Sequence, residues 1–185
     1  MGKNVTIKWH GKADRGLMDA ASTLAVVLAA EGKYVQAFPG FGFKTCGAPA
    51  TAFNRVSQSP IKLHSFVEKP DVEVVADPGL LKYIDFIPDS TENGENTSYI
   101  INTSLTPEFI KEKFNLMGNK IFTLDIPSVS PHIALMTVVI NHLELLPIEN
   151  FKERLKKTLS DKLDNESVME SILIIDRALN EVQGI

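Results

Sequence analysis

The stretch IKWHGKADRGLMDAAS, residues 7–22, joins a segment of β-forming residues to a glycine-bounded turn and the start of an apolar helix. NVTIKWHG alternates in polarity, which predicts a first strand that ends near Gly11. LMDAASTLAVVLAAEG predicts a helix from about Leu17 to Glu31, with Gly32 at the position of a left-handed C-cap. A strand, a glycine turn and a helix in this order are typical of the opening of an α/β fold.

Signals for further strands and helices alternate along the chain. Strands are expected at KYVQAFP, ATAFNRVS, DVEVVADP, SYIINTS and KIFTLDIPS. TPEFIKEKF is expected to be a helix capped by Thr106, with Pro107 at its first position. The apolar run closed by Asp77-Pro78 is typical of a buried parallel strand, and three helical segments follow Pro131. The predicted fold class is α/β: a Rossmann-like sheet, mostly parallel, covered by helices, with a helical C-terminal region.

Length and composition indicate one compact unit. The 185 residues are 44% hydrophobic, which is enough for one sizeable core, so residues 1–185 are expected to form a single domain. The polar segment IPDSTENGENT is expected to be a surface turn within it. The net charge of −4, without a long basic block, argues against a nucleic-acid or membrane-surface partner. No apolar run reaches the roughly 18 residues that span a bilayer, and we expect a cytoplasmic protein.

Cysteine and histidine usage limits the metal and redox chemistry of the chain. A [4Fe–4S] cluster is held by about four thiolates, and Cys46 is the only cysteine, so this chain alone cannot hold one. The histidines are spread along the sequence without paired spacing, so a zinc site is not expected. Cys46 has no base near it in sequence and is interpreted as a small buried residue rather than a catalytic thiol.

The first glycine loop does not match the common nucleotide motifs. Gly11 and Gly16 have the spacing of a triphosphate loop, but Leu17 and Met18 stand where that motif has Lys and Ser or Thr. Ala13 occupies the middle glycine of the dinucleotide pattern. An ATPase or GTPase is therefore excluded, and a stand-alone nicotinamide or flavin enzyme is disfavoured.

The same loop keeps the general properties of an anion site. A helix N-terminus after a strand offers free N–H groups and a positive dipole end. Lys12 and Arg15 add positive charge, whereas Asp14 and Asp19 oppose it or cap the helix themselves. Two interpretations stay open, an anion site and a capped helix start without a ligand. The candidate ligand contacts are Gly11, Lys12, Arg15, Gly16 and Leu17.

Two other features each allow two interpretations. PGFGFKTCGAP alternates glycine with phenylalanine, which suits either a surface approached by a partner or a tight loop whose aromatic rings fill the core. LAVVLAA and IALMTVVI are apolar almost all round, which indicates burial on two sides. Such a helix lies either between the sheet and the C-terminal helices or against another subunit.

GKYVQAFPGFGFKTCGAPATAFNRVS, residues 32–57, resembles the gamma subunit, or gamma domain, of the 2-oxoacid:ferredoxin oxidoreductases, the family of pyruvate synthase. That family shows a similar G-K-x-V-Q-A-F-P, an aromatic-Gly step, a G-A-P and an A-F-x-R-[IV] in this order. The upstream IKWHG and the downstream SPI and PDVEVVADPGLL fit as well, so the resemblance covers about residues 5–85.

The resemblance implies a non-catalytic subunit of an enzyme that oxidatively decarboxylates a 2-oxoacid on thiamine diphosphate. Electrons would pass through iron–sulfur clusters to ferredoxin or another acceptor, and the acyl group usually to coenzyme A. The implied partners are alpha, beta and delta type subunits, which would hold thiamine diphosphate, Mg and the [4Fe–4S] clusters. No cofactor is expected on this chain alone, although its first loop is implicated in holding coenzyme A.

The first loop also departs from the family. Members commonly have G-R-G-G-Q-G there, and Ala13 and Asp14 replace two of those glycines in this chain. A purely structural subunit, whose loop no longer binds coenzyme A, therefore stays open beside the coenzyme A interpretation. The third interpretation is a stand-alone nucleotide-binding enzyme.

Overall fold

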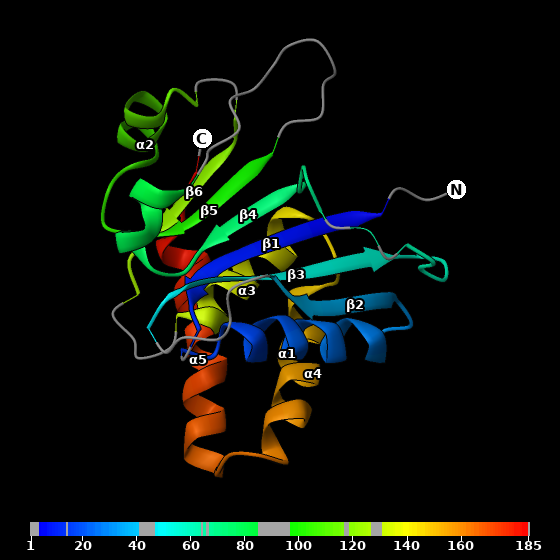
Figure 1. Cartoon of the computed structure of the whole chain (residues 1–185). Helices are drawn as coiled ribbons and strands as arrows, with labels where there is room; N and C mark the ends of the chain where they lie inside the picture. Colours follow the sequence, from blue (N-terminus) through cyan, green and yellow to red (C-terminus); the bar gives the residue numbers. More distant parts are fainter. Residues whose placement is uncertain are drawn as a thin grey trace.

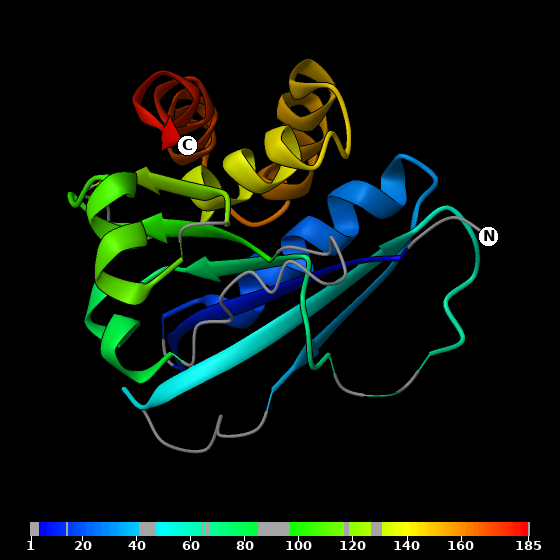
Figure 2. The ribbon, with the colours of Figure 1, turned by 90° about the horizontal axis from the view of Figure 1, so that it is seen from above.

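The computed structural model describes residues 4–13, 15–40, 47–63, 65, 67–84, 97–116, 119–126 and 131–184. They form a seven-stranded sheet with helices on both faces (Figures 1 and 2). The strands are β1 (Val5–Lys12), β2 (Tyr34–Pro39), β3 (Pro49–Ser57), β4 (Val72–Val75), β5 (Ser98–Asn102), β6 (Ile121–Leu124) and β7 (Gln183–Gly184). The helices are α1 (Leu17–Ala30), α2 (Pro107–Phe114), α3 (His132–His142), α4 (Ile148–Ser160) and α5 (Asn165–Glu181), with a short 3-10 helix, η1 (Pro78–Tyr83).

The strands are ordered β2-β3-β1-β4-β5-β6-β7 across the sheet. β1, β4, β5 and β6 are parallel neighbours, whereas β3 is antiparallel to β1 and β2, and β7 is antiparallel to β6. The predicted α/β class with a mostly parallel sheet is confirmed. The antiparallel insertion of β3 was not predicted. It is allowed because only the nine residues 40–48 connect β2 to β3, whereas a parallel pair needs a longer crossover.

Alternate residues of the central strands enter two cores. Ile7 and Trp9 of β1 and Val74 of β4 are fully buried on the face covered by α1, α3, α4 and α5. Tyr99 and Ile101 of β5 are fully buried on the other face, against α2 and η1. Because both faces of these parallel strands are covered, the edge where the strands end is left for a binding site.

The local helix signals are confirmed. α1 begins at the predicted residue and ends one residue earlier than predicted, and Gly32 has the left-handed φ of 79°. The side chain of Thr106 accepts a hydrogen bond from the Phe109 N–H at 3.3 Å, and Pro107 lies in the first turn of α2. These signals are local in sequence, which is why they could be recognised there.

The two apolar helices differ in their surroundings. α3 lies between the sheet and α5, and every residue of 134–140 is buried, so the interpretation as a central helix is confirmed for α3. α1 packs on β2, β3, α3 and α4, but Val26 on its outer side is 53% exposed. The alternative of a subunit contact thus stays a prediction for α1 alone.

Several sequence features lie outside the described residues. They are Asp14, residues 41–46 of the second glycine loop with Cys46, His64, and residues 87–96 of the polar turn. Within the ranges that the structure covers, no helix is long and apolar enough to cross a membrane.

Candidate functional site

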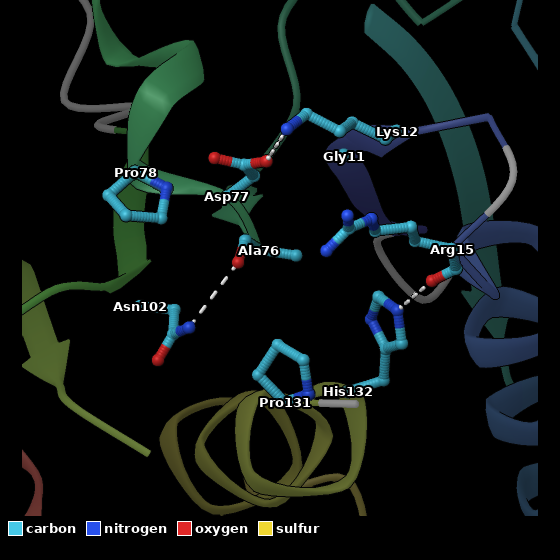
Figure 3. A pocket seen from close by; sticks show the side chains of 9 residues that line it. All are labelled: Gly11, Lys12, Arg15, Ala76, Asp77, Pro78, Asn102, Pro131 and His132. Carbon is cyan, nitrogen blue, oxygen red and sulfur yellow. Dashed lines mark hydrogen bonds and ion pairs between the residues drawn. The ribbon is translucent and has the colours of Figure 1, made fainter. Parts of the chain in front are cut away.

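A cavity of about 240 Å³ opens at the edge of the sheet where β1, β4 and β5 end (Figure 3). The chain leaves β1 toward β2 and β3 on one side and returns as β4 on the other side of β1. A reversal of this kind, at the carboxyl ends of parallel strands, is where α/β sheets commonly bind ligands. The lining residues are Gly11, Lys12, Arg15, Ala76, Asp77, Pro78, Asn102, Pro131 and His132.

An ion pair joins the ends of β1 and β4 at this edge. Lys12 Nζ lies 2.8 Å from Asp77 Oδ2, and Asp77 Oδ1 accepts a hydrogen bond from the Gly79 N–H at 2.8 Å, which caps η1. Burial raises the pKa of Asp77. Hydrogen bonds from Lys12 and Gly79, with the charges of Lys12 and Arg15, outweigh burial and leave the pKa of Asp77 below its ordinary value. Asp77 is therefore ionised at neutral pH and neutralises much of the Lys12 charge.

Arg15 is the cation of the cavity lining that forms no ion pair with another described residue. Its backbone N–H bonds to the Lys12 carbonyl at 3.2 Å in the turn between β1 and α1. Figure 3 shows its side chain turned into the cavity. Among the described residues its guanidinium forms no ion pair, whereas Lys12 is paired with Asp77. The planar guanidinium donates several hydrogen bonds and suits a phosphate or carboxylate.

His132, the first residue of α3, closes the cavity from the C-terminal half of the chain. Its Nε2 lies 2.6 Å from the Arg15 carbonyl oxygen, and the residue is only 6% exposed. Burial lowers the pKa of His132, although the Arg15 carbonyl and the charge of Asp19 act in the opposite direction. The ring is therefore neutral at physiological pH. It ties the turn before α1 to the start of α3.

Gly16 and Leu17 support the turn rather than line the cavity. Gly16 is the N-cap of α1 with φ of 68°, and a Cβ there would lie 3.6 Å from the His132 ring. Leu17 is 1% exposed, and its Cδ1 would lie 2.9 Å from a Cβ on Gly11, so Leu17 fills the space that this glycine leaves. The interpretation of Asp19 as a helix cap is wrong, because within the described ranges its exposed carboxylate makes no hydrogen bond.

Asn102 holds the wall of the cavity that lies opposite His132 (Figure 3). Its Nδ2 donates to the Ala76 carbonyl at 3.4 Å, and its Oδ1 accepts from the Ile126 N–H at 3.3 Å. Asn102 thus connects the segments that follow β4 and β6. The cavity is therefore held by side-chain contacts among four separate parts of the chain.

The described lining residues suit the binding of an anion. Among them there is no Ser, Thr, Cys or Tyr. The charged side chains among the described lining residues are two cations and one carboxylate, and that carboxylate is paired with Lys12. A neutral histidine and the guanidinium of Arg15, which has no ion-pair partner in the described ranges, together suit an anionic ligand with hydrogen-bonding groups.

The family model for pyruvate ferredoxin/flavodoxin oxidoreductase matches residues 6–181 of the chain. The chain belongs to this family. The expected resemblance to its gamma subunit is confirmed by the common gamma subunit of the pyruvate/ketoisovalerate oxidoreductases of Thermococcus litoralis. The two chains are 34% identical over 171 residues, which cover 88% of this chain and 91% of the relative.

Solved structures of the family share the fold. The crystal structure of pyruvate oxidoreductase subunit PORC from Thermotoga maritima is 28% identical, with a TM-score of 0.76 over 98% of both chains. The 2-oxoglutarate:ferredoxin oxidoreductase of Magnetococcus marinus, with 2-oxoglutarate, coenzyme A and succinyl-CoA bound, has a TM-score of 0.64. That likeness covers 96% of this chain and 31% of the larger one at 18% identity, and it shows the fold alone.

Three of the five residues predicted from the sequence, Gly11, Lys12 and Arg15, line the cavity. Asp77 and Asn102 were not predicted as site residues, although both lie at the ends of predicted strands. Ends of neighbouring parallel strands share one edge of a sheet, and this rule could have found them. His132 was not predicted as a site residue either, because its place depends on how α3 packs and no local sequence signal marks it.

Proposed function

We propose that this chain is the gamma-type subunit of a multi-subunit 2-oxoacid:acceptor oxidoreductase. The complex would decarboxylate a 2-oxoacid oxidatively and pass the electrons to ferredoxin or another acceptor. Family membership over residues 6–181 and similarity along 91% of a gamma subunit support the proposal. In this role the chain is non-catalytic and contributes to assembly with alpha, beta and delta type subunits.

The redox and decarboxylation cofactors would lie on those partner subunits. The sequence has a single cysteine and so does not fit a [4Fe–4S] cluster, which takes about four thiolates. In the parts of the chain that the structure covers, no group of three or more His, Cys, Asp or Glu side chains could hold a metal ion. Thiamine diphosphate, Mg and the clusters are therefore assigned to the partners in this proposal.

Coenzyme A is the ligand we propose for the cavity. The observation that carries this assignment is the Arg15 guanidinium, which faces the cavity without an ion-pair partner among the described residues. Lys12 adds a second, partly neutralised charge at the end of β1. Both cations lie before the N-terminus of α1, whose dipole also favours a phosphate. When bound, the coenzyme would supply the thiol that accepts the acyl group.

The size of the cavity limits how much of the coenzyme it can hold. Its volume of about 240 Å³ is below the roughly 300–1,000 Å³ of sites that enclose a whole drug-sized ligand. This chain would therefore hold a phosphate-bearing part of coenzyme A. The remaining part would lie against a partner subunit.

One observation favours the second candidate, a purely structural subunit without coenzyme A at this loop. Asp77 already satisfies Lys12 at 2.8 Å, and a like charge near the site opposes a phosphate. The assembled enzyme separates the two candidates. Acyl-CoA formation that depends on Arg15 excludes the structural candidate, and turnover that does not require coenzyme A supports it.

Isolation of the native complex tests the subunit role itself. The chain would be purified from its source under mild conditions, and the co-purifying chains identified by mass spectrometry. We expect partners that contain multi-cysteine cluster motifs and a thiamine diphosphate-binding chain. Recovery of this chain alone, with 2-oxoacid oxidation elsewhere in the fractionation, contradicts the proposal and favours a stand-alone protein.

A further inference from the structure

His132 has a ring nitrogen whose hydrogen-bonding capacity the fold does not use. The Arg15 carbonyl can only accept a hydrogen bond, so the contact at 2.6 Å requires that Nε2 carries the proton. In the neutral ring Nδ1 is then an acceptor. Nδ1 is buried and has no hydrogen-bond partner in the described part of the chain.

The position of this nitrogen points to a ligand. His132 is more than nine-tenths buried and lines the cavity. Figure 3 shows the second ring nitrogen on the cavity side of the ring, turned away from the Arg15 carbonyl. A buried acceptor without a partner is rare in folded proteins, and where one occurs it often serves a function such as binding. The Arg15 guanidinium lies on the same side of the ring.

We propose that His132 Nδ1 accepts a hydrogen bond from an O–H or N–H group next to the anionic group of the ligand. The cavity would thereby select anions that carry such a donor over bare anions. The inference deepens the proposed anion site and rests on it, because Arg15 supplies the charge and its carbonyl orients the ring.

The ligand class that satisfies both groups is a phosphate ester with a hydroxyl on a neighbouring carbon. Arg15 would bind the phosphate oxygens and His132 would accept the hydroxyl proton in a hydrogen bond. The phosphorylated ribose of coenzyme A carries such a pair. A simple alkyl phosphate offers the same charge without the donor, so the two ligands can be compared directly.

The test compares glycerol 3-phosphate with propyl phosphate by calorimetric titration of the full chain. At about pH 8 both phosphates are dianions and His132 is neutral. We expect glycerol 3-phosphate to bind about fivefold more tightly than propyl phosphate, because one additional hydrogen bond contributes a binding free energy of about this size. Equal affinities, or no measurable binding of either ester, overturn the inference.

Two variants separate the two ring nitrogens. The amide of His132→Gln reaches the Arg15 carbonyl as Nε2 does but removes the acceptor at Nδ1. The amide oxygen of His132→Asn takes the place of Nδ1 but loses the contact with Arg15. We expect His132→Gln to abolish the preference for glycerol 3-phosphate while propyl phosphate binds as before, which also shows that the variant is folded. His132→Asn should keep the preference and weaken both ligands.

Coenzyme A in the same titration separates this inference from the proposed function. In one outcome, coenzyme A binds through Arg15, and His132→Gln changes neither the affinity for coenzyme A nor the preference between the two esters. The inference about His132 then fails, and the proposed coenzyme A site stands. If coenzyme A does not bind but the preference for glycerol 3-phosphate disappears in His132→Gln, the coenzyme assignment fails and the inference stands.

Discussion

Asp77 holds Lys12 by an ion pair of 2.8 Å and so removes much of one of the two positive charges that the cavity presents. Both residues are partly exposed, at 34% for the Lys12 side chain and 25% for that of Asp77. Solvent therefore weakens the pair but does not cancel its effect on an incoming anion. In the proposed anion site, Asp77 would oppose the ligand that Arg15 attracts and would lower the affinity of the site.

The substitution Asp77→Asn should strengthen anion binding. The amide oxygen can still accept the Gly79 N–H, so the cap of η1 is kept while the negative charge is removed. We expect the Kd for coenzyme A to fall about 5- to 30-fold, since a partly screened unit charge at this range is worth about 1–2 kcal/mol. Titration calorimetry measures the change.

Asp77→Ala is the matched control for that prediction. It removes the charge and the cap together, so the gain in affinity should be similar. The free energy of unfolding should also fall by about 1 kcal/mol, as for other lost caps. An unchanged Kd in both variants would show that Asp77 does not act on the ligand.

Gly16→Ala should perturb both the fold and the site. The left-handed φ of 68° costs a non-glycine residue about 1–2 kcal/mol, and relief of that strain would shift the turn that carries Arg15; the new methyl group itself would only touch His132, at 3.6 Å. Gly32→Ala is the control, because its φ is also positive, at 79°, but a Cβ there has no neighbour within 4 Å. Both variants should lose similar stability in urea titrations, and only Gly16→Ala should weaken ligand binding. Equal binding by both would contradict the role of this turn.

Stability should decrease as the pH falls below neutral. Burial lowers the pKa of His132, opposed in part by the Arg15 carbonyl and Asp19, and burial together with Lys120 lowers that of His142. Between these lowered values and the ordinary value of about 6.5 the unfolded chain binds more protons than the folded one, so stability rises with pH across this window. The contribution of these two histidines to the free energy of unfolding is complete above about pH 6.5 and is lost as the pH falls through this window.

Thermal unfolding at a series of pH values measures this effect. Tm should fall on acidification in the wild type, and His132→Gln should flatten that part of the curve because it removes one titrating ring. His142→Gln provides a second comparison away from the cavity. A Tm in the double variant that falls as steeply as in the wild type would show that other groups control the acid limb.

Glu73 should be the most sensitive charged residue of the sheet. It is fully buried in β4, where its carboxylate contacts His10 Nε2 at 2.6 Å and Lys8 Nζ at 3.5 Å. Glu73→Gln removes the buried carboxylate that both partners contact and should lower the free energy of unfolding by about 3 kcal/mol. Lys8→Met should cost about 1 kcal/mol or less, because Lys8 is partly exposed and its contact is long. Urea denaturation of both variants measures which of the two substitutions lowers the free energy of unfolding more.

The sequence predicted those parts of the fold that depend on neighbours along the chain. The strand ending at Gly11-Lys12, the helix from Leu17 and the cap at Thr106 all follow from local preferences. The antiparallel place of β3 did not follow, because the order of strands in a sheet depends on long-range packing. The expectation of a single domain over residues 1–185 stays a prediction.

The residues of the candidate site also fall into two groups, those that could be predicted from local sequence and those that only long-range packing brings together. Gly11, Lys12 and Arg15 come from one loop and were predicted together, whereas His132 lies 117 positions from Arg15 and meets it only because α3 packs beside α1. The ion pair of Lys12 with Asp77 depends on β1 and β4 being neighbours. Local sequence therefore predicts the charge of the site but not the groups that modulate it.

The most direct test of the central claim is the KM for coenzyme A of the assembled enzyme that contains the Arg15→Ala chain. We expect it to rise about 10-fold or more, since a charge-assisted contact contributes about 1.5–3 kcal/mol, with the KM for the 2-oxoacid unchanged. Lys12→Ala should have a smaller effect because Asp77 already holds Lys12, and Lys156→Ala, an exposed residue of α4, should have none. An unchanged KM for coenzyme A in the Arg15→Ala enzyme would contradict the assignment of this cavity.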